Sequence, residues 1–213
     1  QRQVILKGFG MEAQERLFRS RVLVVGAGGL GCPVLQYLGG AGIGRIGIID
    51  DDRISIHNLH RQPIYTTASV GRWKAEAAAE TIRALNPDIE VVAYAARLTN
   101  ALCLELFFAY DYILDCTDNF ETRYMINDAC VLLGKPLISG AVSQYEGQVS
   151  IFNVATPEQP IPVNYRDIFP EPPAPGEVLN CADAGVLGTL PGVIGSMMAG
   201  ELIKLITGIG EPL

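Results

Sequence analysis

A glycine-rich turn between an apolar strand and an apolar helix is the feature that most constrains this chain. Residues 21–25 (RVLVV) predict a buried strand, and a second strand over 45–49 ends at Asp50. The turn after the first strand carries three glycines, at positions Gly26, Gly28 and Gly31. Glycines at this spacing let backbone N–H groups approach a phosphate at the helix N-terminus, and an acid that ends the next strand can bind ribose hydroxyls. The pattern predicts a nucleotide-binding α/β domain.

Strands and helices continue to alternate after this turn. The predicted strands cover residues 89–93, 112–115, 136–140 and 147–153, and the predicted helices cover 70–85, 101–108, 121–133 and 190–207. Such alternation is typical of a doubly wound, mostly parallel sheet with helices on both faces, which is a Rossmann-like fold. Between Thr156 and Pro175 prolines are frequent and no periodicity persists, which predicts a proline-rich crossing loop.

Length and composition favour a single domain. Hydrophobic residues make up 49% of the chain and charged residues 18%, so a large apolar core is expected. We expect one domain over residues 1–213, with an N-terminal arm over 1–20, a nucleotide-binding core over 21–153, a loop region over 154–188, and a C-terminal helix and tail over 189–213.

Charge and cysteine content exclude several classes of partner. The formal net charge is −7 and no basic block offsets it, so nucleic acid is not an expected partner. The apolar segments 22–49 and 184–200 are interrupted or ended by charged residues, so neither is expected to span a membrane. The five scattered cysteines and the absence of a basic-then-apolar leader favour a cytoplasmic protein.

A group of cations and amides follows the second strand. It consists of Asn58, Arg61, Gln62 and Lys74. A dinucleotide dehydrogenase holds its diphosphate in the glycine turn and needs no such group, whereas a triphosphate requires several cations and hydrogen-bond donors. The alternative is that Arg61 and Lys74 are ordinary solvated charges.

A second acidic position follows the strand over 112–115. Asp118 and Asn119 lie at the carboxyl edge of the predicted sheet, where ligands bind in open α/β folds. A carboxylate that faces a triphosphate normally binds Mg²⁺. We therefore expect Asp118 to be the metal ligand and Asn119 to contact the nucleotide. The alternative is that Asp118 caps the helix that begins near Phe120.

Taken together, these motifs resemble the ThiF/MoeB/HesA family. The resemblance rests on residues 2–6 (RQVIL), 26–31 (GAGGLG), 50–52 (DDD), 58–62 (NLHRQ), 115–119 (DCTDN), 140–147 and 180–188 (NCADAGVLG), together with Lys74. Members are bacterial relatives of ubiquitin-activating enzymes. They use ATP and Mg²⁺ to adenylate the C-terminal glycine of ubiquitin-like sulfur-carrier proteins that end in Gly-Gly, in the thiamine or molybdopterin pathway.

The resemblance implies a role for several residues. Gly29 would lie in the phosphate turn, and Asp50 and Asp52 at the ribose and the active centre. The phosphates would be bound by Asn58, Arg61 and Lys74, and Mg²⁺ by Asp118. Arg2 matches an arginine that family members insert into the partner subunit's site, which implies a homodimer.

The sequence departs from the family at a zinc site. Many members hold a structural zinc with two Cys-x-x-Cys pairs, and the first pair is replaced here by Asn164 and Asp167. Because these side chains are poor ligands for a tetrahedral zinc site, we expect no zinc. Cys181 aligns with a cysteine that takes up the activated carrier in some relatives. No cation lies next to it in sequence, so a nucleophilic role and a structural role are equally open. The other four cysteines are expected to pack in the interior.

Three further alternatives remain at this point. The first is a nicotinamide-dependent oxidoreductase that uses the same glycine turn. The second is a scaffold that binds a carrier protein without activating it. The third, within the same superfamily, is activation of a small-molecule or tRNA-base carboxylate, of which the tRNA version fits the acidic composition less well.

Overall fold

The computed structural model describes residues 2–157, 159–173 and 185–213 and contains one six-stranded sheet. The strands are β1 (Arg21–Val25), β2 (Arg45–Ile49), β3 (Glu90–Tyr94), β4 (Tyr112–Asp115), β5 (Leu137–Ser143) and β6 (Glu146–Phe152). Their order across the sheet is β3-β2-β1-β4-β5-β6. All neighbours pair in parallel except β5 and β6, which form an antiparallel hairpin. The predicted doubly wound, mostly parallel α/β fold is confirmed.

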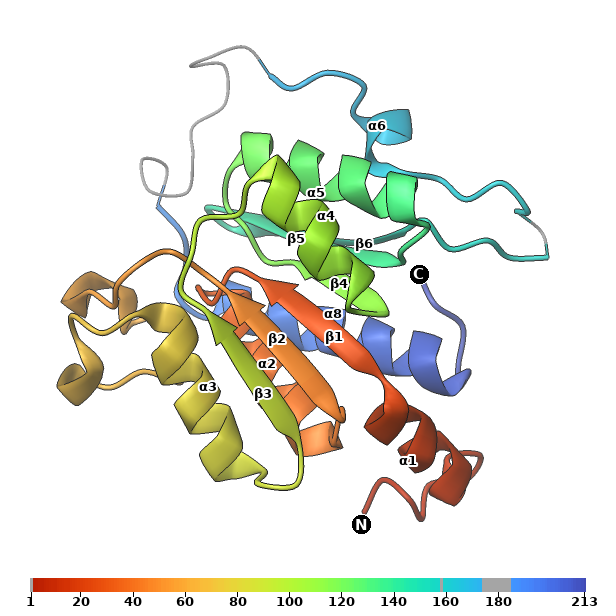
Figure 1. The fold of residues 1–213 in the computed structure, drawn as a ribbon, viewed down its shortest axis with the longest axis horizontal. Helices are drawn as coiled ribbons and strands as arrows, with labels where there is room; N and C mark the ends of the chain where they lie inside the picture. The colour runs from red at the N-terminus through yellow and green to blue at the C-terminus, as the bar shows by residue number, and fades with distance from the viewer. Residues whose placement is uncertain (1, 158, 174–184) are drawn as a thin grey trace.

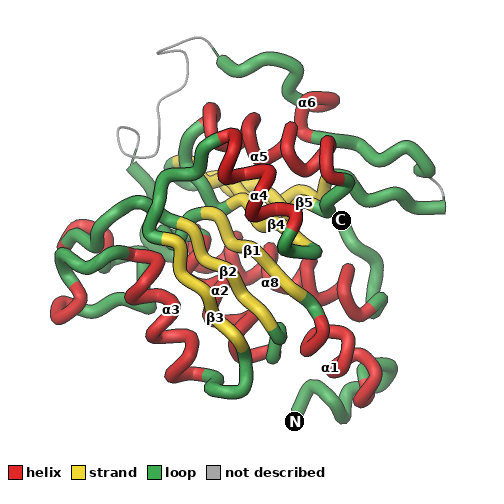
Figure 2. Tube along the Cα trace, in the orientation of Figure 1, coloured by secondary structure: helices red, strands yellow, loops and turns green. Residues whose placement is uncertain are grey.

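Helices cover both faces of this sheet (Figures 1 and 2). They are α1 (Gly10–Arg19), α2 (Gly31–Ala41), α3 (Lys74–Leu85), α4 (Asn100–Phe108), α5 (Phe120–Leu133), α6 (Tyr165–Ile168) and α8 (Leu190–Thr207), with short 3₁₀ turns at Ile56–Asn58 and Thr67–Ser69. Helices α2, α3 and α8 pack against one face, and α4 and α5 against the other.

Strand β1 shows how the sequence builds two cores. Val22 and Val24 belong to the apolar cluster that contains α2, α3 and α8, whereas Leu23 and Val25 belong to the cluster beneath α4 and α5. Successive side chains of a strand point to opposite faces, so a strand covered on both sides must be apolar at every position. This is the physical reason why residues 22–25 (VLVV) form an unbroken apolar run rather than an alternating one.

The N-terminal arm contains a helix that the sequence analysis did not predict. Phe9, Ala13 and Leu17 recur every four residues and are buried on one side of α1, which packs on α8. The arm also carries exposed apolar side chains, among them Ile5, Leu6 and Met11. The apolar stripe is only two turns long and lies among polar residues, which is why its period was hard to detect.

Helix α3 begins at Lys74 and not at Val70 as predicted. A 3₁₀ turn at Thr67–Ser69 precedes it, Gly71 adopts a left-handed conformation with φ of +88°, and Trp73 is extended. A left-handed residue and an extended one cannot belong to a continuous α-helix. The consequence is that Lys74 starts the helix, close to the end of β2.

Helix α8 is long and apolar enough to cross a membrane by length and composition alone. Half of that segment is buried inside the structure, where it packs on α2 and on the β5–β6 hairpin. Gly140 and Gly147 allow this contact, because a Cβ at either position would overlap Met198 or Ile194 of α8. The apolar character of α8 is therefore explained by its position in the core.

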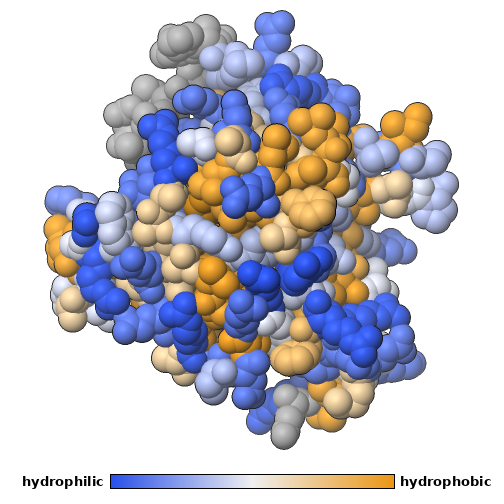
Figure 3. Space-filling model, in the orientation of Figure 1, coloured by the Kyte–Doolittle hydropathy of each residue, from blue (hydrophilic) through white to orange (hydrophobic). Residues whose placement is uncertain are grey.

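Apolar side chains also gather at the surface over α4, as Figure 3 shows. Exposed members on α4 and at the end of α5 are Leu104, Phe108, Val131 and Leu132.

Two glycines of α2 provide a matched pair for testing the turn. A Cβ at Gly31 would overlap the carbonyl oxygen of Gly26, whereas a Cβ at the exposed Gly40 would meet nothing within 4 Å. We expect Gly31→Ala to lower the free energy of unfolding by about 2 kcal/mol or more, because the turn must open. Gly40→Ala should raise it by about 0.5–1 kcal/mol through helix propensity. Urea unfolding of both variants checks this; equal effects would contradict the assigned packing.

The segment at the missing zinc ligands is ordered by hydrogen bonds. The Asn164 side chain caps α6 by accepting from the Arg166 N–H at 2.9 Å, and Asp167 Oδ2 accepts from the Asn164 N–H at 2.8 Å and from Asn164 Nδ2 at 2.6 Å. Arg166 also forms an ion pair with Asp128 at 2.7 Å. Tyr165 is buried against Tyr124, Phe152 and Phe169. A reciprocal cap between Asn164 and Asp167 and an aromatic cluster around Tyr165 thus order this segment.

The hydrogen bonds of Asn164 and Asp167 predict that a zinc chelator does not affect the stability of the protein. Incubation with EDTA should leave the thermal midpoint unchanged, whereas Asn164→Ala should cost about 1 kcal/mol through loss of the cap. Differential scanning fluorimetry with and without chelator checks both effects. A fall in the midpoint on chelation that zinc reverses would show that a structural zinc is present after all.

Candidate active site

A pocket of about 1080 Å³ opens at the carboxyl edge of the sheet, beyond the ends of β1, β2 and β4. It collects the predicted nucleotide-binding residues Gly26, Gly28, Gly29, Asp50, Asp52, Asn58, Arg61, Gln62, Lys74, Asp118 and Asn119. Gly31, also predicted, does not line it and instead packs against Gly26. Chain segments that follow β1, β2 and β4 therefore meet at one site, as expected for the point at which strand order reverses in a doubly wound sheet.

The glycine turn is held tightly against the end of β4. Gly26 is left-handed with φ of +94°, and a Cβ there would lie 2.8 Å from the carbonyl oxygen of Cys116. Only glycine suits both the conformation and the space. Helix α2 starts directly after the turn, so its unpaired N–H groups and the positive end of its dipole lie at the pocket.

Asp50 connects the end of β2 to the turn. One carboxylate oxygen accepts from the Ala27 N–H at 2.8 Å and the other from the Asp52 N–H at 2.8 Å. Burial raises the pKa of Asp50, against the opposing effects of Lys74 and of these two N–H groups. Each oxygen retains a further lone pair, so Asp50 can still accept a hydrogen bond from a ribose hydroxyl.

Lys74 is a buried cation that faces an exposed acid. Its side chain is 7% exposed and that of Asp52 is 69% exposed, with Nζ and Oδ2 separated by 2.7 Å. The Lys74 N–H also donates to the Asp52 carbonyl oxygen at 3.0 Å. The alternative that Lys74 is an ordinary solvated charge is wrong, because a buried ammonium requires nearby anions.

Residues 58–62 form a compact series of turns beside the glycine turn. Asn58 Oδ1 accepts from the Ser55 N–H at 3.0 Å, and Arg61 donates to the His57 carbonyl at 3.2 Å. Gln62 is 2% exposed, and its Oε1 has no hydrogen-bond partner among the described residues. This oxygen can accept a hydrogen bond from water or from an N–H or O–H group of a ligand in the pocket.

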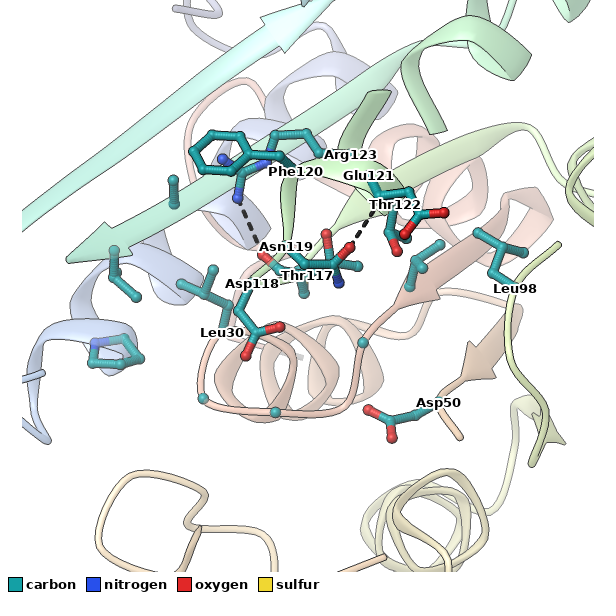
Figure 4. A pocket seen from close by; sticks show the side chains of 18 of the residues that line it. Leu30, Asp50, Leu98, Thr117, Asp118, Asn119, Phe120, Glu121, Thr122 and Arg123 are labelled. Carbon is teal, nitrogen blue, oxygen red and sulfur yellow. Dashed lines mark hydrogen bonds between the residues drawn. The ribbon is translucent and has the colours of Figure 1, made fainter. Parts of the chain in front are cut away.

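Asp118 and Asn119 differ in their contacts at the start of α5. Asn119 Oδ1 accepts from the Thr122 N–H at 2.9 Å and is the N-cap of α5, so the alternative that Asp118 caps this helix is wrong. Asp118 is exposed, and no hydrogen-bond or ion-pair partner is found for it within the described part of the chain. Figure 4 shows the carboxylates of Asp118 and Asp50 directed into the same pocket from different strands.

The oxygen ligands that Mg²⁺ requires are present in this pocket. Asp118 is one such carboxylate, since it is exposed, lines the pocket and has no cation partner among the described residues. The carboxylates of Asp50, Asp51 and Asp52 lie within 4.8 Å of one another, but Lys74 already neutralises Asp52. The assignment of Mg²⁺ to Asp118 stays a prediction.

Several pocket residues were not predicted from the sequence. Arg97 and Leu98 line the pocket from the loop after β3, and Arg123 lines it from α5. Arg123 is buried, lies 3.5 Å from Asp115 Oδ2 and donates to the Thr117 carbonyl at 3.1 Å (Figure 4). Its position one helical turn after Asn119 is the signal that could have identified it, because residues four apart share a helix face.

Two other predicted site residues are not part of the described pocket. Arg2 is exposed and does not line it, and Cys181 lies outside the described residues. The remaining cysteines, Cys32, Cys103, Cys116 and Cys130, are free and buried, as predicted. Burial raises the pKa of Cys32 to about 12, which keeps its thiol protonated near neutral pH.

Comparison with known proteins gives sequence matches that span the whole of this chain. The ThiF family matches residues 1–213. The chain is 54% identical over 212 residues to a sulfur carrier protein adenylyltransferase of Thermus thermophilus, covering 100% of this chain and 78% of the relative. It is 51% identical to the probable adenylyltransferase/sulfurtransferase MoeZ of Mycobacterium tuberculosis and 48% identical to the adenylyltransferase and sulfurtransferase MOCS3 of Drosophila grimshawi. The chain spans 54% and 46% of these two longer proteins.

Solved structures with the same fold are more distant in sequence. E. coli MccB, in its complex with MccA-N7isoASN, superposes with a TM-score of 0.81 at 23% identity, covering 95% of this chain and 61% of MccB. PaaA superposes with a TM-score of 0.78 at 24% identity, covering 95% of this chain and 60% of PaaA. These likenesses establish the fold.

Proposed function

This chain belongs to the ThiF family, and we propose that it adenylates the C-terminal glycine of a ubiquitin-like sulfur-carrier protein with ATP. One observation carries the proposal. A glycine turn, a buried lysine and a free aspartate meet in one pocket of a chain that is 54% identical to a sulfur carrier protein adenylyltransferase. The carrier would end in Gly-Gly and serve the thiamine or molybdopterin pathway.

The reaction requires no general base. A C-terminal carboxylic acid has a pKa of about 3.5, so at neutral pH the carrier carboxylate is already ionised. One of its oxygens attacks the α-phosphorus of ATP and forms an acyl-adenylate. The bond from that phosphorus to the bridging oxygen breaks, and pyrophosphate leaves with the electron pair. The barrier is the approach of one anion to another, which a set of cations and N–H donors lowers.

The pocket supplies these groups from different elements. The N–H groups of the glycine turn and of the start of α2 would face the phosphates, and Arg61, Gln62 and Lys74 follow β2 at the same edge of the sheet. Asp50 accepts from the ribose. Asp118 would hold Mg²⁺, which supplies positive charge to the phosphate oxygens. In this scheme Lys74 exchanges part of its interaction with Asp52 for the phosphates.

The oxidoreductase and scaffold alternatives are less well supported by the pocket. A dinucleotide is held at its diphosphate by the glycine turn, which leaves Arg61 and Lys74 without a role in binding. A scaffold has no use for Asp118, which does not cap α5 and has no cation partner among the described residues. Preference for ATP over NAD in equilibrium binding would argue against the oxidoreductase. Activation of a small carboxylic acid would use the same pocket groups. The two reactions are distinguished by which carboxylate supports exchange, that of the carrier protein or that of the small acid.

We further propose that the active form is a homodimer in which Arg2 reaches the partner's pocket. Arg2 lies outside the pocket of its own protomer, and the arm that carries it exposes Ile5, Leu6 and Met11. Exposed apolar groups beside a functional cation suit an interface. The free buried cysteines and the net charge of −7 support a cytoplasmic protein that binds neither membranes nor nucleic acids. Analytical ultracentrifugation checks the dimer.

The experiment that tests the function is pyrophosphate–ATP exchange. The protein is incubated with Mg²⁺, ATP, labelled pyrophosphate and a carrier that ends in Gly-Gly, beside a carrier that lacks the last glycine. Exchange that depends on the intact carrier supports the proposal. Exchange with a small carboxylic acid alone, or none with any carrier despite ATP binding, would overturn it.

A further inference from the structure

Tyr65 lies where the three phosphate-facing segments of the pocket meet. It is 5% exposed and does not line the pocket. Its hydroxyl donates to the Ala27 carbonyl at 2.8 Å, and the Lys74 carbonyl lies 3.2 Å from the same hydroxyl. The Tyr65 N–H donates to the Gln62 carbonyl at 3.2 Å. One buried residue therefore contacts the glycine turn, the 58–62 segment and the first residue of α3.

The hydrogen bond to Ala27 determines the orientation of a peptide group in the turn. The carbonyl of Ala27 and the N–H of Gly28 belong to the same planar peptide and point in opposite directions. Because the Ala27 carbonyl accepts from the buried Tyr65 hydroxyl, it points toward the core. The Gly28 N–H therefore points away from the core. Gly28 lines the pocket on that side. The preceding peptide is fixed independently, because the Ala27 N–H donates to Asp50.

The Tyr65 hydroxyl acts as a hydrogen-bond donor because of its protonation state and its two neighbours. Burial raises the pKa of Tyr65, so the phenol remains protonated near neutral pH. Both nearby oxygens are backbone carbonyls, which can only accept. The contact is thus a fixed donor between two acceptors, one on the turn and one on Lys74.

We propose that Tyr65 is a positioning residue for the nucleotide: its hydroxyl fixes the glycine turn relative to Lys74 and so sets where the phosphates bind. The inference rests on the proposed function for the identity of the nucleotide. Tyr65 does not touch the phosphates. It acts through the Ala27–Gly28 peptide and through the start of α3.

Tyr65→Phe tests this, with Tyr110→Phe as a matched control. Tyr110 is also fully buried and its hydroxyl lies 3.0 Å from that of Tyr94, but it does not line the pocket. Both variants should lower the thermal midpoint by similar amounts. Only Y65F should weaken equilibrium ATP binding and raise the KM for ATP, by about five- to tenfold as expected for one hydrogen bond. The KM for the carrier should not change.

The outcomes separate the two proposals. If Y65F loses stability as Y110F does but binds ATP like the wild type, Tyr65 is only structural and the inference is wrong. If wild-type protein shows no carrier-dependent exchange while Y65F still weakens ATP binding, the positioning role is supported and the proposed function fails. ATP binding is measured directly, so it does not depend on turnover.

Discussion

Replacing Asp118 with alanine should reduce carrier-dependent pyrophosphate exchange on the order of a thousandfold. The expected loss is this large because Asp118, an exposed carboxylate that lines the pocket at the end of β4 without a cation partner among the described residues, is proposed to hold Mg²⁺. The thermal midpoint should change little. The N-cap of α5 is Asn119, and removing a solvated side chain that forms no cap costs about 0.5 kcal/mol or less.

The matched control for this variant is Asp88→Ala. Asp88 is an equally exposed aspartate in the turn before β3, outside the pocket. It should keep wild-type exchange and stability. Binding of the carrier to Asp118→Ala should also be retained, since the carboxylate is assigned to the metal. If Asp118→Ala retains full exchange, Mg²⁺ is held elsewhere and the assignment is wrong.

Replacing Lys74 with methionine should lower kcat/KM for ATP by about a hundred- to a thousandfold. Methionine fills a similar volume without the charge, so the core beneath α3 is preserved. Asp52, which loses its partner, is 69% exposed and can be solvated by water, so stability should fall only slightly. Steady-state exchange kinetics and the thermal midpoint, measured on the same preparation, separate the two effects.

Lys135→Met serves as the control for loss of a partly buried lysine. Its Nζ donates to the Tyr110 carbonyl at 2.7 Å, before the start of β4, whereas the glycine turn packs on Cys116 at the carboxyl end of that strand, and Lys135 does not line the pocket. We expect it to lose stability and to keep wild-type kinetics. If Lys74→Met instead kept its affinity for ATP and its rate, Lys74 would be a structural partner of Asp52 alone.

The parts of the site that depend on spacing along one segment were predictable. The turn over 26–31, the acid at Asp50 and the motif over 58–62 are each read within a few residues of chain. Parallel strands bring their carboxyl ends to one edge, so the predicted alternation of parallel strands and helices was sufficient to place them together. Asp118 was predicted on the same grounds.

The contacts between segments were not predictable. The burial of Lys74 depends on a helix that starts after a left-handed Gly71, and such a start cannot be read from an alanine-rich helical pattern. Arg123 reaches the pocket because α5 is capped at Asn119 and turns this face toward Asp115. The hydroxyl contacts of Tyr65 join positions separated by 38 residues in sequence, which no local motif records.

Helix α1 was missed for a different reason. Its apolar stripe of Phe9, Ala13 and Leu17 has the right period, but it is short and no side-chain cap marks its N-terminus. Phe9 occupies the N-cap without a side-chain hydrogen bond, and Ser20 follows the last turn in an extended conformation. Packing on α8 stabilises the helix, and that contact is tertiary.

The most direct test of the central claim is the mass of the carrier after reaction. A carrier protein that ends in Gly-Gly is incubated with this protein, ATP and Mg²⁺, with pyrophosphatase present to draw the reaction forward, and its intact mass and C-terminal peptide are measured. We predict that an adenylyl group is added at the C-terminal glycine, and that Asp118→Ala does not add it. An unmodified carrier in the presence of wild-type protein that binds ATP would contradict the assignment of this pocket to carrier adenylation.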